Sequence, residues 1–284
     1  MLSIYEQIEQ LIDPSLGNRG LRGEWCHGNL EKIVRLLNSA RKVLIITGFC
    51  IPECQIGETD GPLGALSIAA SLRKLDKEVY IGTDSYSYSI SNGASKIIGL
   101  SQCIVNIESK SETDFKHLVQ SVDVLLFIER PSKAKDGLFY NMNGKDISEY
   151  VIDTDVCITW AKEMTIPVVA IGDGGNEVGM GSIGSKINQY VPLGSLICAQ
   201  SKVDHLLLSS ISNWGGYAVS AGLQKMSGEA CLNDLETEKQ LLYELVKYGA
   251  VDGVTKRNEP SVDGMNEQVY FEGYKRIWDL ISTT

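Results

Sequence analysis

Hydrophobic and polar positions along the chain alternate between two patterns. Short apolar runs bounded by turn residues predict buried strands, at residues 43–47, 79–83, 104–107, 122–128, 168–171, 195–199 and 206–209. Apolar residues at helical spacing predict helices between these runs, at residues 3–12, 62–75, 91–99, 112–120, 156–164, 186–190, 234–248 and 264–281, with two more beginning at Asn29 and at Ser212 or Asn213. This alternation predicts an α/β fold: a doubly wound, mostly parallel sheet with helices on both faces, in three αβα layers.

The 284 residues are enough for one large α/β domain with an ample core. The sequence contains no internal repeat, low-complexity tract or clear linker. We therefore expect a single domain over residues 1–284, in which residues from about 225 to 284 form an α-rich C-terminal appendage.

Glycine is concentrated directly after the apolar run at 168–171. The segment Gly172–Gly184 holds six glycines in thirteen residues, together with Asp173, Asn176 and Glu177. Each glycine costs roughly 0.5–1 kcal/mol against alanine in a regular element, so this density favours a site where the backbone must turn or approach a ligand closely. The alternative is a tight turn with solvated acids. The spacing matches neither GxxxxGK[ST] nor GxGxxG, so no nucleotide cofactor is expected.

Carboxylates follow several of the predicted strands. Because the carboxyl ends of parallel strands meet at one sheet edge, we expect these acids to share a crevice. Acids gathered with few basic partners raise one another's pKa or recruit a divalent cation. Oxygen ligands favour Mn²⁺ or Mg²⁺, with Ca²⁺ possible. The expected metal ligands are Glu58, Asp60, Asp173 and Glu177.

Other acids have a structural reading of equal or greater weight. Asp84 is as consistent with a helix cap as with a ligand, and Glu129–Arg130 as consistent with a surface ion pair as with a site. Asp153 and Asp155 fit a cap on the helix that begins near residue 156 better than a ligand role.

A second unusual cluster is Asn213-Trp214-Gly215-Gly216-Tyr217. Paired glycines at a helix start suit the close approach of an anion to backbone N–H groups. Core packing of Trp214 and Tyr217 explains the same residues equally well.

The net charge of -10 argues against general binding of nucleic acid, which requires a basic surface. The first residues carry acids where a signal peptide would be apolar, and no apolar run is long enough to cross a membrane. Seven cysteines without a CxxC pair indicate reduced thiols, so a cytoplasmic location is expected. Only three histidines are present, which directs attention to carboxylates for any chemistry.

Six stretches of the sequence, in this order, resemble the C-terminal module of the D-glutamate cyclase family, and together they span most of the chain. They are ITGF (46–49), ETDGPLGA (58–65), IERP (128–131), DGLFYNMNGKDIS (136–148), IGDGGNEVGMG (171–181) and SNWGGYA (212–218). The stretches at 172–181 and 212–217 are the most specific. In the long proteins of that family the module follows a hydro-lyase-like domain, and this chain corresponds to the C-terminal module alone.

The resemblance implies a lyase that closes D-glutamate to 5-oxo-D-proline with loss of water. A divalent ion would then polarise the γ-carboxylate while a carboxylic acid moves the proton. The residues expected to be catalytic are Asp173, Glu177 and Glu129. Those expected to bind the substrate are Thr47, Gly48, Gly61, Arg130, Gly174, Gly175, Asn176, Asn213, Trp214, Gly215 and Gly216.

Two other functions use the same residues. One is metal-dependent hydrolysis of a phosphorylated small molecule or nucleotide, in which the ion offsets the phosphate charge. The other is a non-catalytic module that binds a metal or an amino acid and pairs with a hydro-lyase domain. The expected partner is a small-molecule substrate, which for the cyclase is an amino acid or carboxylate. The chain is also expected either to form a homo-oligomer or to bind a separate hydro-lyase domain.

Overall fold

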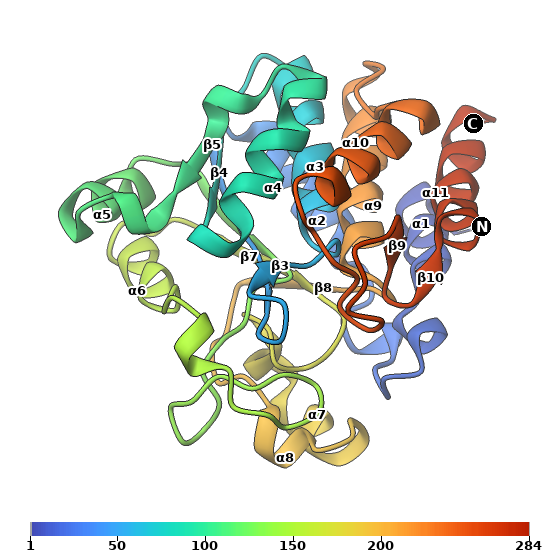
Figure 1. The fold of residues 1–284 in the computed structure, drawn as a ribbon. Coiled ribbons are helices and arrows are strands. Elements are labelled where there is room, and N and C mark those ends of the chain that lie inside the picture. Colours follow the sequence, from blue (N-terminus) through green and yellow to red (C-terminus); the bar gives the residue numbers. More distant parts are fainter. Residues whose placement is uncertain (1, 284) are drawn as a thin grey trace.

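A six-stranded parallel sheet forms the centre of the computed structural model, which describes residues 2–283 (Figure 1). The strand order is β5-β4-β1-β6-β7-β8. The strands are β1 (Lys42–Thr47), β4 (Glu78–Thr83), β5 (Ile104–Asn106), β6 (Val124–Ile128), β7 (Val168–Gly172) and β8 (His205–Leu208). The chain winds from β1 to one edge and then returns to build the other half from β6. This arrangement confirms the predicted doubly wound sheet.

Side chains of successive strand residues enter two separate cores. In β1, Val43 and Ile45 belong to one core, whereas Leu44 and Ile46 belong to the other. Helices supplying the first core are α1 (Ile4–Leu11), α2 (Asn29–Ser39), α3 (Pro62–Lys74), α4 (Ser85–Ser95), α9 (Ser212–Ser227), α10 (Leu235–Lys247) and α11 (Glu267–Ser282). Those supplying the second are α5 (Glu112–Gln120), α6 (Val156–Glu163), α7 (Gly184–Tyr190) and α8 (Gly194–Ile197). The three-layer prediction is therefore confirmed (Figure 1).

The register of the central strands places their carboxyl ends level with one another. Thr47 of β1 pairs with Ile128 of β6, which in turn pairs with Ile171 of β7. The strand order reverses between β1 and β6, and open α/β sheets bind ligands in the crevice at such a switch point. The loops after β1, β6 and β7 therefore meet where a site is expected.

Two elements differ from the sequence-based expectation. Residues 195–199 do not form a strand, because Leu193 adopts a left-handed φ of 57° and Gly194 starts the short helix α8 against the backbone of Ile187. Helix α4 begins at Ser85, six residues earlier than predicted, because the Asp84 carboxylate accepts the Ser87 N–H at 3.0 Å and caps it.

The C-terminal segment is built into the same core as the sheet. Leu241 and Leu245 of α10 are fully buried in a helix that packs against α3 and α4, and Tyr270 and Tyr274 are fully buried where α11 packs against α9. Between these helices lies a two-stranded hairpin, β9 (Ser261–Val262) and β10 (Met265–Asn266). A second small hairpin, β2 (Cys50–Ile51) and β3 (Ile56–Gly57), follows β1.

Helices α3 and α9 approach each other closely enough that their backbones touch. A Cβ placed on Gly216 would lie 2.4 Å from the Cα atom of Gly64. One placed on Gly215 would lie 2.4 Å from the side chain of Ile171. Gly215 and Gly216 thus serve helix packing, in agreement with the core reading of this cluster rather than with contact to a ligand.

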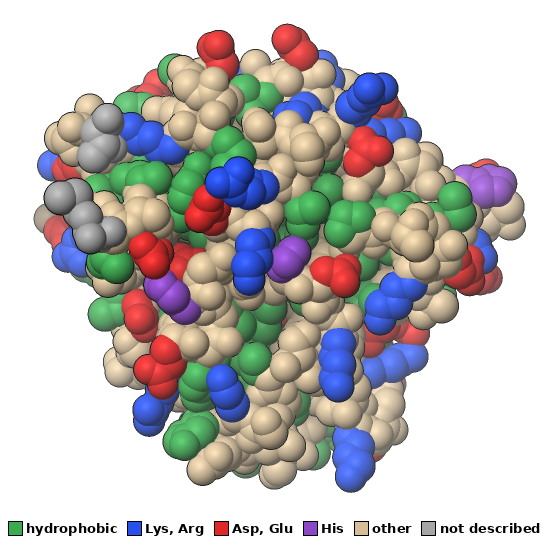
Figure 2. Space-filling model, turned by 180° about the vertical axis from the view of Figure 1, so that it is seen from behind, with side chains coloured by type: hydrophobic (Ala, Val, Ile, Leu, Met, Phe, Trp, Pro, Cys, Tyr) green, Lys and Arg blue, Asp and Glu red, His purple; other side chains and the backbone are tan. Residues whose placement is uncertain are grey.

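The surface carries both signs of charge. On the face opposite to that of Figure 1, acidic and basic side chains are interspersed among polar ones (Figure 2). In residues 2–283, none of the helices combines the length and the apolar character needed to cross a bilayer.

We expect Gly216→Ala to lower the free energy of unfolding by about 2 kcal/mol or more, because the new methyl group meets backbone that cannot move aside. Denaturant unfolding measures the change. Gly184→Ala is the matched control: Gly184 has a helical φ of -55° and its nearest neighbour would be the Cys198 sulfur at 3.4 Å. Equal losses in the two variants would contradict this packing argument.

Glu238 predicts a pH dependence of stability. Its side chain is fully buried beside Asn233, and burial raises the pKa of its carboxyl from 4.5 to about 7. The folded protein therefore keeps a proton that the unfolded chain releases, so stability falls as the pH rises through this interval. Glu238→Gln removes the titration. We compare the free energy of unfolding of this variant with that of the unsubstituted protein. The difference, variant minus unsubstituted protein, should increase by on the order of 3 kcal/mol between pH values below ~4.5 and above ~7. A difference independent of pH would contradict this.

Candidate functional site

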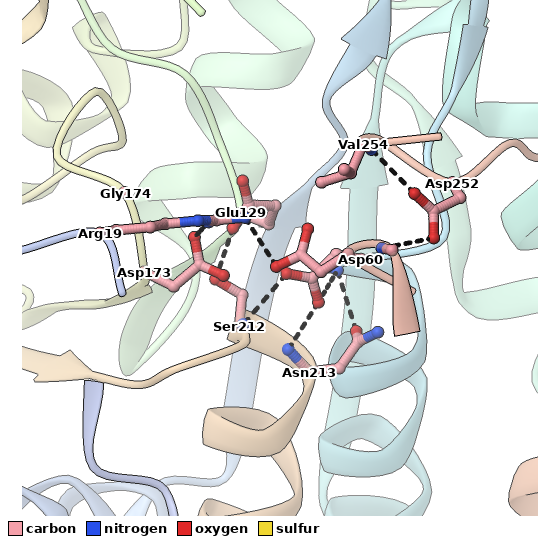
Figure 3. Close-up of polar contacts among 12 residues, drawn as sticks. Arg19, Asp60, Glu129, Asp173, Gly174, Ser212, Asn213, Asp252 and Val254 are labelled. Carbon is pink, nitrogen blue, oxygen red and sulfur yellow. Dashed lines mark hydrogen bonds and ion pairs between the residues drawn. The ribbon is translucent and has the colours of Figure 1, made fainter. Parts of the chain in front are cut away.

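Three carboxylates from three different loops converge at the sheet edge (Figure 3). Asp60 precedes α3, Glu129 follows β6 and Asp173 follows β7. Each offers an oxygen, and these oxygens lie within 4.8 Å of one another. The expected convergence of acids from distant parts of the sequence is thus present. Of the predicted metal ligands, Asp60 and Asp173 belong to this group, and its third member is Glu129, which was predicted to be catalytic.

Asp60 is held by the amino end of helix α9. Its carboxylate accepts the N–H groups of Ser212 at 3.0 Å and Asn213 at 2.8 Å. In return, the Asn213 side-chain oxygen accepts the N–H groups of Gly61 at 2.9 Å and Gly64 at 2.8 Å. The helix dipole favours a negative charge at this position. The anion at the start of this helix is therefore the protein's own Asp60.

Glu129 is placed by an unusual backbone conformation. Its φ of 43° lies in the left-handed region, which costs a non-glycine residue energy and is concentrated at functional sites. The Ser212 hydroxyl donates a hydrogen bond to its carboxylate. Gly61, with φ of 92°, leaves room for it, since a Cβ there would lie 2.6 Å from the Glu129 Cβ.

Asp173 carries an oxygen without a partner. The Arg19 guanidinium donates to Oδ1, whereas Oδ2 is buried and accepts no hydrogen bond within residues 2–283. Buried carboxylate oxygens are normally hydrogen-bonded, so this unpartnered oxygen beside two other acids is a candidate position for a ligand.

Glu177 holds the glycine loop in shape. Its two carboxylate oxygens accept the N–H groups of Asp173 at 3.1 Å and of Gly174 and Gly175 at 2.6 Å each. The N–H groups of Gly174 and Gly175, predicted to hold the substrate, are occupied by this side chain. Glu177 itself lies outside the group of three acids because both of its oxygens point into the loop.

Arg130, predicted to bind a substrate carboxylate, is a buried structural residue. Its side chain is 1% exposed and forms an ion pair with Asp84. It also donates to the carbonyls of Gly48 at 2.9 Å and Ile152 at 2.7 Å. These contacts join the loops after β1, β4 and β6 beneath the site, and they leave Asp84 with a capping and pairing role.

The remaining predicted residues divide between wall and core. Asn176 lines the cavity described below, with its side-chain amide donating to the Tyr140 carbonyl at 2.7 Å. The Thr47 hydroxyl is buried and unpartnered beside Gly61. The Trp214 ring packs against Gly273 of α11, so it serves the core and not the predicted contact with a substrate.

Asp153 and Asp155 do not act as caps. The Asp155 carboxylate accepts the Ser132 hydroxyl and the Lys133 N–H, both at 3.0 Å, while Asp153 forms an ion pair with Lys133. Both residues fix the loop that follows β6.

Sequence analysis missed two residues of the site, Arg19 and Asp263. Arg19 comes from the N-terminal loop and forms ion pairs with Asp173 and, at 2.7 Å, with Asp263 in the turn between β9 and β10. The only local signal was Asp263-Gly264, a turn dipeptide. Nothing in the sequence around Arg19 marks it as a partner of residues so distant.

A cavity of about 280 Å³ opens above the acids. Its walls come from the β2–β3 hairpin, the loop after β6, the glycine loop and the C-terminal hairpin region. The charged residues that line it are Arg19, Glu53, Glu58, Glu129, Glu177, Lys256 and Asp263. Glu58 lies beside Gly253, where any Cβ would meet its carboxylate at 1.8 Å.

Burial and mutual repulsion make this site electrostatically unusual. Burial, followed by neighbouring acids, raises the pKa values of Glu58, Glu129 and Asp173 well above their ordinary range. Burial and Asp263 raise the pKa of Asp60 to about 7 against the N–H bonds from α9. Burial opposes the charge of Arg19, but Asp173 and Asp263 outweigh it and raise the pKa of the guanidinium. The acids exceed the charge that Arg19 can balance.

The donor set fits a hard divalent cation. Oxygens that share one ion lie at most twice the metal–oxygen distance apart, about 4 Å for Mg²⁺ and about 5 Å for Ca²⁺. The oxygens of Asp60, Glu129 and Asp173 lie within 4.8 Å of one another, which is inside the limit for Ca²⁺, whereas Mg²⁺ would require them to move closer together. The Asp173 Oδ2 atom, which accepts no hydrogen bond within residues 2–283, supplies a free lone pair. Carboxylate oxygens alone favour Mg²⁺, Mn²⁺ or Ca²⁺ over softer metals.

The family model described as D-glutamate cyclase-like, C-terminal, matches residues 8–276. The chain belongs to this family. A relative, the mitochondrial D-glutamate cyclase of Homo sapiens, is 32% identical over 241 residues, which cover 76% of this chain and 38% of the relative. The chain thus matches well under half of that protein's length. A solved exopolyphosphatase-related protein from Bacteroides fragilis has a TM-score of 0.42 and 12% identity, over 90% of this chain and 60% of that one. That likeness is too distant to inform function.

Glu177 provides a test of the glycine loop of this family member. We expect Glu177→Ala to lower the free energy of unfolding by about 3 kcal/mol or more, because three N–H groups lose their acceptor. Glu177→Gln keeps one oxygen, so its free energy of unfolding should lie between that of the unsubstituted protein and that of Glu177→Ala. Denaturant unfolding gives both values. A loss below about 0.5 kcal/mol in the alanine variant, as for ordinary surface positions, would show that Glu177 does not hold the loop.

Proposed function

We propose that the chain catalyses the metal-assisted cyclisation of D-glutamate to 5-oxo-D-proline. The observation that carries the proposal is the group formed by Asp60, Glu129 and Asp173, which includes an unpartnered oxygen of Asp173 and borders a cavity of about 280 Å³ through Glu129. The name of the human relative supplies the substrate. The match covers only 38% of that relative, so the activity of this chain alone is part of the proposal.

Asp60, Glu129 and Asp173 would hold the divalent cation. Once bound, the cation would polarise the γ-carboxyl group of the substrate and offset the charge of the surrounding acids. Three contacts support the ligands: the N–H groups of α9 fix Asp60, the Ser212 hydroxyl fixes Glu129 and the loop held by Glu177 fixes Asp173. Such support keeps the oxygens in place before the ion arrives.

The protein contributes mainly by folding the substrate for ring closure. The α-amine must reach the γ-carbon of the same molecule, and a well-oriented intramolecular attack needs little further help. The cavity walls hold the substrate in a bent conformation. They also exclude bulk water, which strengthens every charge interaction inside.

Glu58 is the group best placed to move the proton. It lines the cavity, is buried, and lies outside the three metal-holding acids, whereas Glu177 is committed to the glycine loop. The ammonium group of the substrate gives up two protons as the C–N bond forms, and the γ-carbon loses one oxygen. Glu58 takes one proton from nitrogen and delivers it to the departing oxygen. With the second proton from nitrogen that oxygen leaves as water, and the product is a lactam that keeps the α-carboxylate and its single negative charge.

We expect the purified protein with D-glutamate and Mn²⁺ or Mg²⁺ to release 5-oxoproline, measured by chromatography, and EDTA to abolish the release. Glu58→Gln should lower turnover about a hundredfold or more, because it removes a general acid–base group. Its binding of Mn²⁺, followed by calorimetry, should persist. Asp173→Asn should instead weaken Mn²⁺ binding.

Glu53→Gln is the matched control, since Glu53 lies at the rim of the same cavity and pairs with Lys145 and Lys256. It should retain turnover. Absence of 5-oxoproline at high protein concentration would reject the substrate, and activity that survives EDTA would reject the role of the metal. Phosphate release from a panel of phosphorylated metabolites would favour the hydrolase instead.

A further inference from the structure

An ion pair between Arg19 and Asp263 lies in the wall of the cavity, next to the three acids. The Nη2 atom of Arg19 and the Oδ2 atom of Asp263 are 2.7 Å apart, and the side chains are 23% and 9% exposed. The two residues stand 244 positions apart in the sequence. Neither belongs to the three acids proposed to hold the cation, and the proposed cyclisation as described above uses neither.

Defined turns place both residues of this ion pair. Asp263 has a φ of 54° in the Asp263-Gly264 turn of the β9–β10 hairpin, and Arg19 lies between Asn18 at 55° and Gly20 at 87°. Asp, Asn and Gly are the residues that adopt the left-handed region most readily, so the sequence specifies these turns. The two side chains are therefore carried by turns of defined conformation.

The guanidinium retains free donors. One N–H of Arg19 binds Asp173 and another binds Asp263, and within residues 2–283 the remaining N–H groups of its five make no hydrogen bond. The planar fork of arginine matches a carboxylate with two parallel hydrogen bonds. Arg19 can thus receive a carboxylate from the cavity without releasing both of its present partners.

From this geometry we propose that Arg19 and Asp263 recognise the head group of an α-amino acid. The guanidinium of Arg19 binds the α-carboxylate and the carboxylate of Asp263 binds the α-ammonium group. A zwitterion placed against an ion pair brings no net charge into the buried site, and each buried charge keeps an opposite partner. The choice of a side-chain carboxylate as the group that reaches the metal-holding acids rests on the proposed function.

This arrangement orients the substrate. Arg19 contacts Asp173 as well as Asp263, so a head group at the ion pair lies next to the acid cluster (Figure 3). The side chain of the amino acid then extends toward Asp60 and Glu129. The site should be selective for amino acids with an acidic side chain over simple dicarboxylates and simple amines.

Two analogues of glutamate separate the two contacts. Glutarate lacks the α-ammonium group, and 4-aminobutyrate lacks the α-carboxylate. In calorimetric titrations with Mn²⁺ present, each should bind the unsubstituted protein about tenfold or more weakly than D-glutamate, the loss expected for one charged hydrogen-bonded contact.

Variants assign each contact to its residue. Arg19→Gln should weaken D-glutamate binding about tenfold or more and leave 4-aminobutyrate unaffected, because that analogue has no group for Arg19. Asp263→Asn should likewise weaken D-glutamate binding about tenfold or more. It should leave glutarate binding unaffected, because glutarate has no ammonium group for Asp263. Arg22→Gln is the matched control: Arg22 lies on the same loop but stacks on the Tyr190 ring at 5.0 Å, and it does not line the cavity.

Equal affinity of the unsubstituted protein for D-glutamate, glutarate and 4-aminobutyrate would overturn the inference, and this measurement holds even if a variant does not fold. Loss of binding of all three ligands alike in Arg19→Gln would overturn the assignment to Arg19. Turnover measured in the same samples tests the cyclase separately. Selective binding of D-glutamate without 5-oxoproline would reject the proposed reaction and leave the recognition of the head group standing.

Discussion

The site depends on the burial of several carboxylates at one edge of a parallel sheet. Water would separate and solvate such charges, but the fold removes them from water and directs them toward one another. Arg19 balances part of this charge, and the raised pKa values of Glu58, Glu129 and Asp173 measure what is left. A ligand that brings positive charge would offset this cost, which is the basis of the cation in the proposed function.

The acids of this region have two different tasks, which their hydrogen-bond partners separate. Both carboxylate oxygens of Glu177 accept hydrogen bonds from backbone N–H groups. The Asp84 carboxylate caps helix α4 and forms an ion pair with Arg130. Asp173 keeps an oxygen that accepts no hydrogen bond within residues 2–283, and Glu58 lines the cavity. Residue type alone does not distinguish the groups, because the decisive feature is how many donors the surrounding backbone supplies.

The fold and the place of the site were predictable from the sequence. Apolar runs predicted all six strands of the central sheet, and the acids after them indicated at which edge of the sheet a site would lie. The errors came from tertiary contacts. The segment 195–199 is as apolar as a strand but becomes helical against Ile187, and Gly215 and Gly216 serve the contact with α3.

The identity of individual site residues was less predictable. Arg130 stands next to Glu129 in the sequence, yet its side chain turns into the core to meet Asp84. Arg19 and Asp263 lie in loops without periodicity, and only the folded chain brings them together. Local patterns report which backbone is helical or extended. They carry no information about which side chains meet across more than two hundred residues.

The cavity wall joins two segments that are far apart in the sequence, because Arg19 lies in the loop after α1 and Asp263 in the turn before α11. Helices α1 and α11 pack against each other on the same side of the molecule (Figure 1). The wall therefore exists only while both helices are packed beside the sheet. Local unfolding of either one would part Arg19 from Asp263 and open the cavity, while the central strands keep their register.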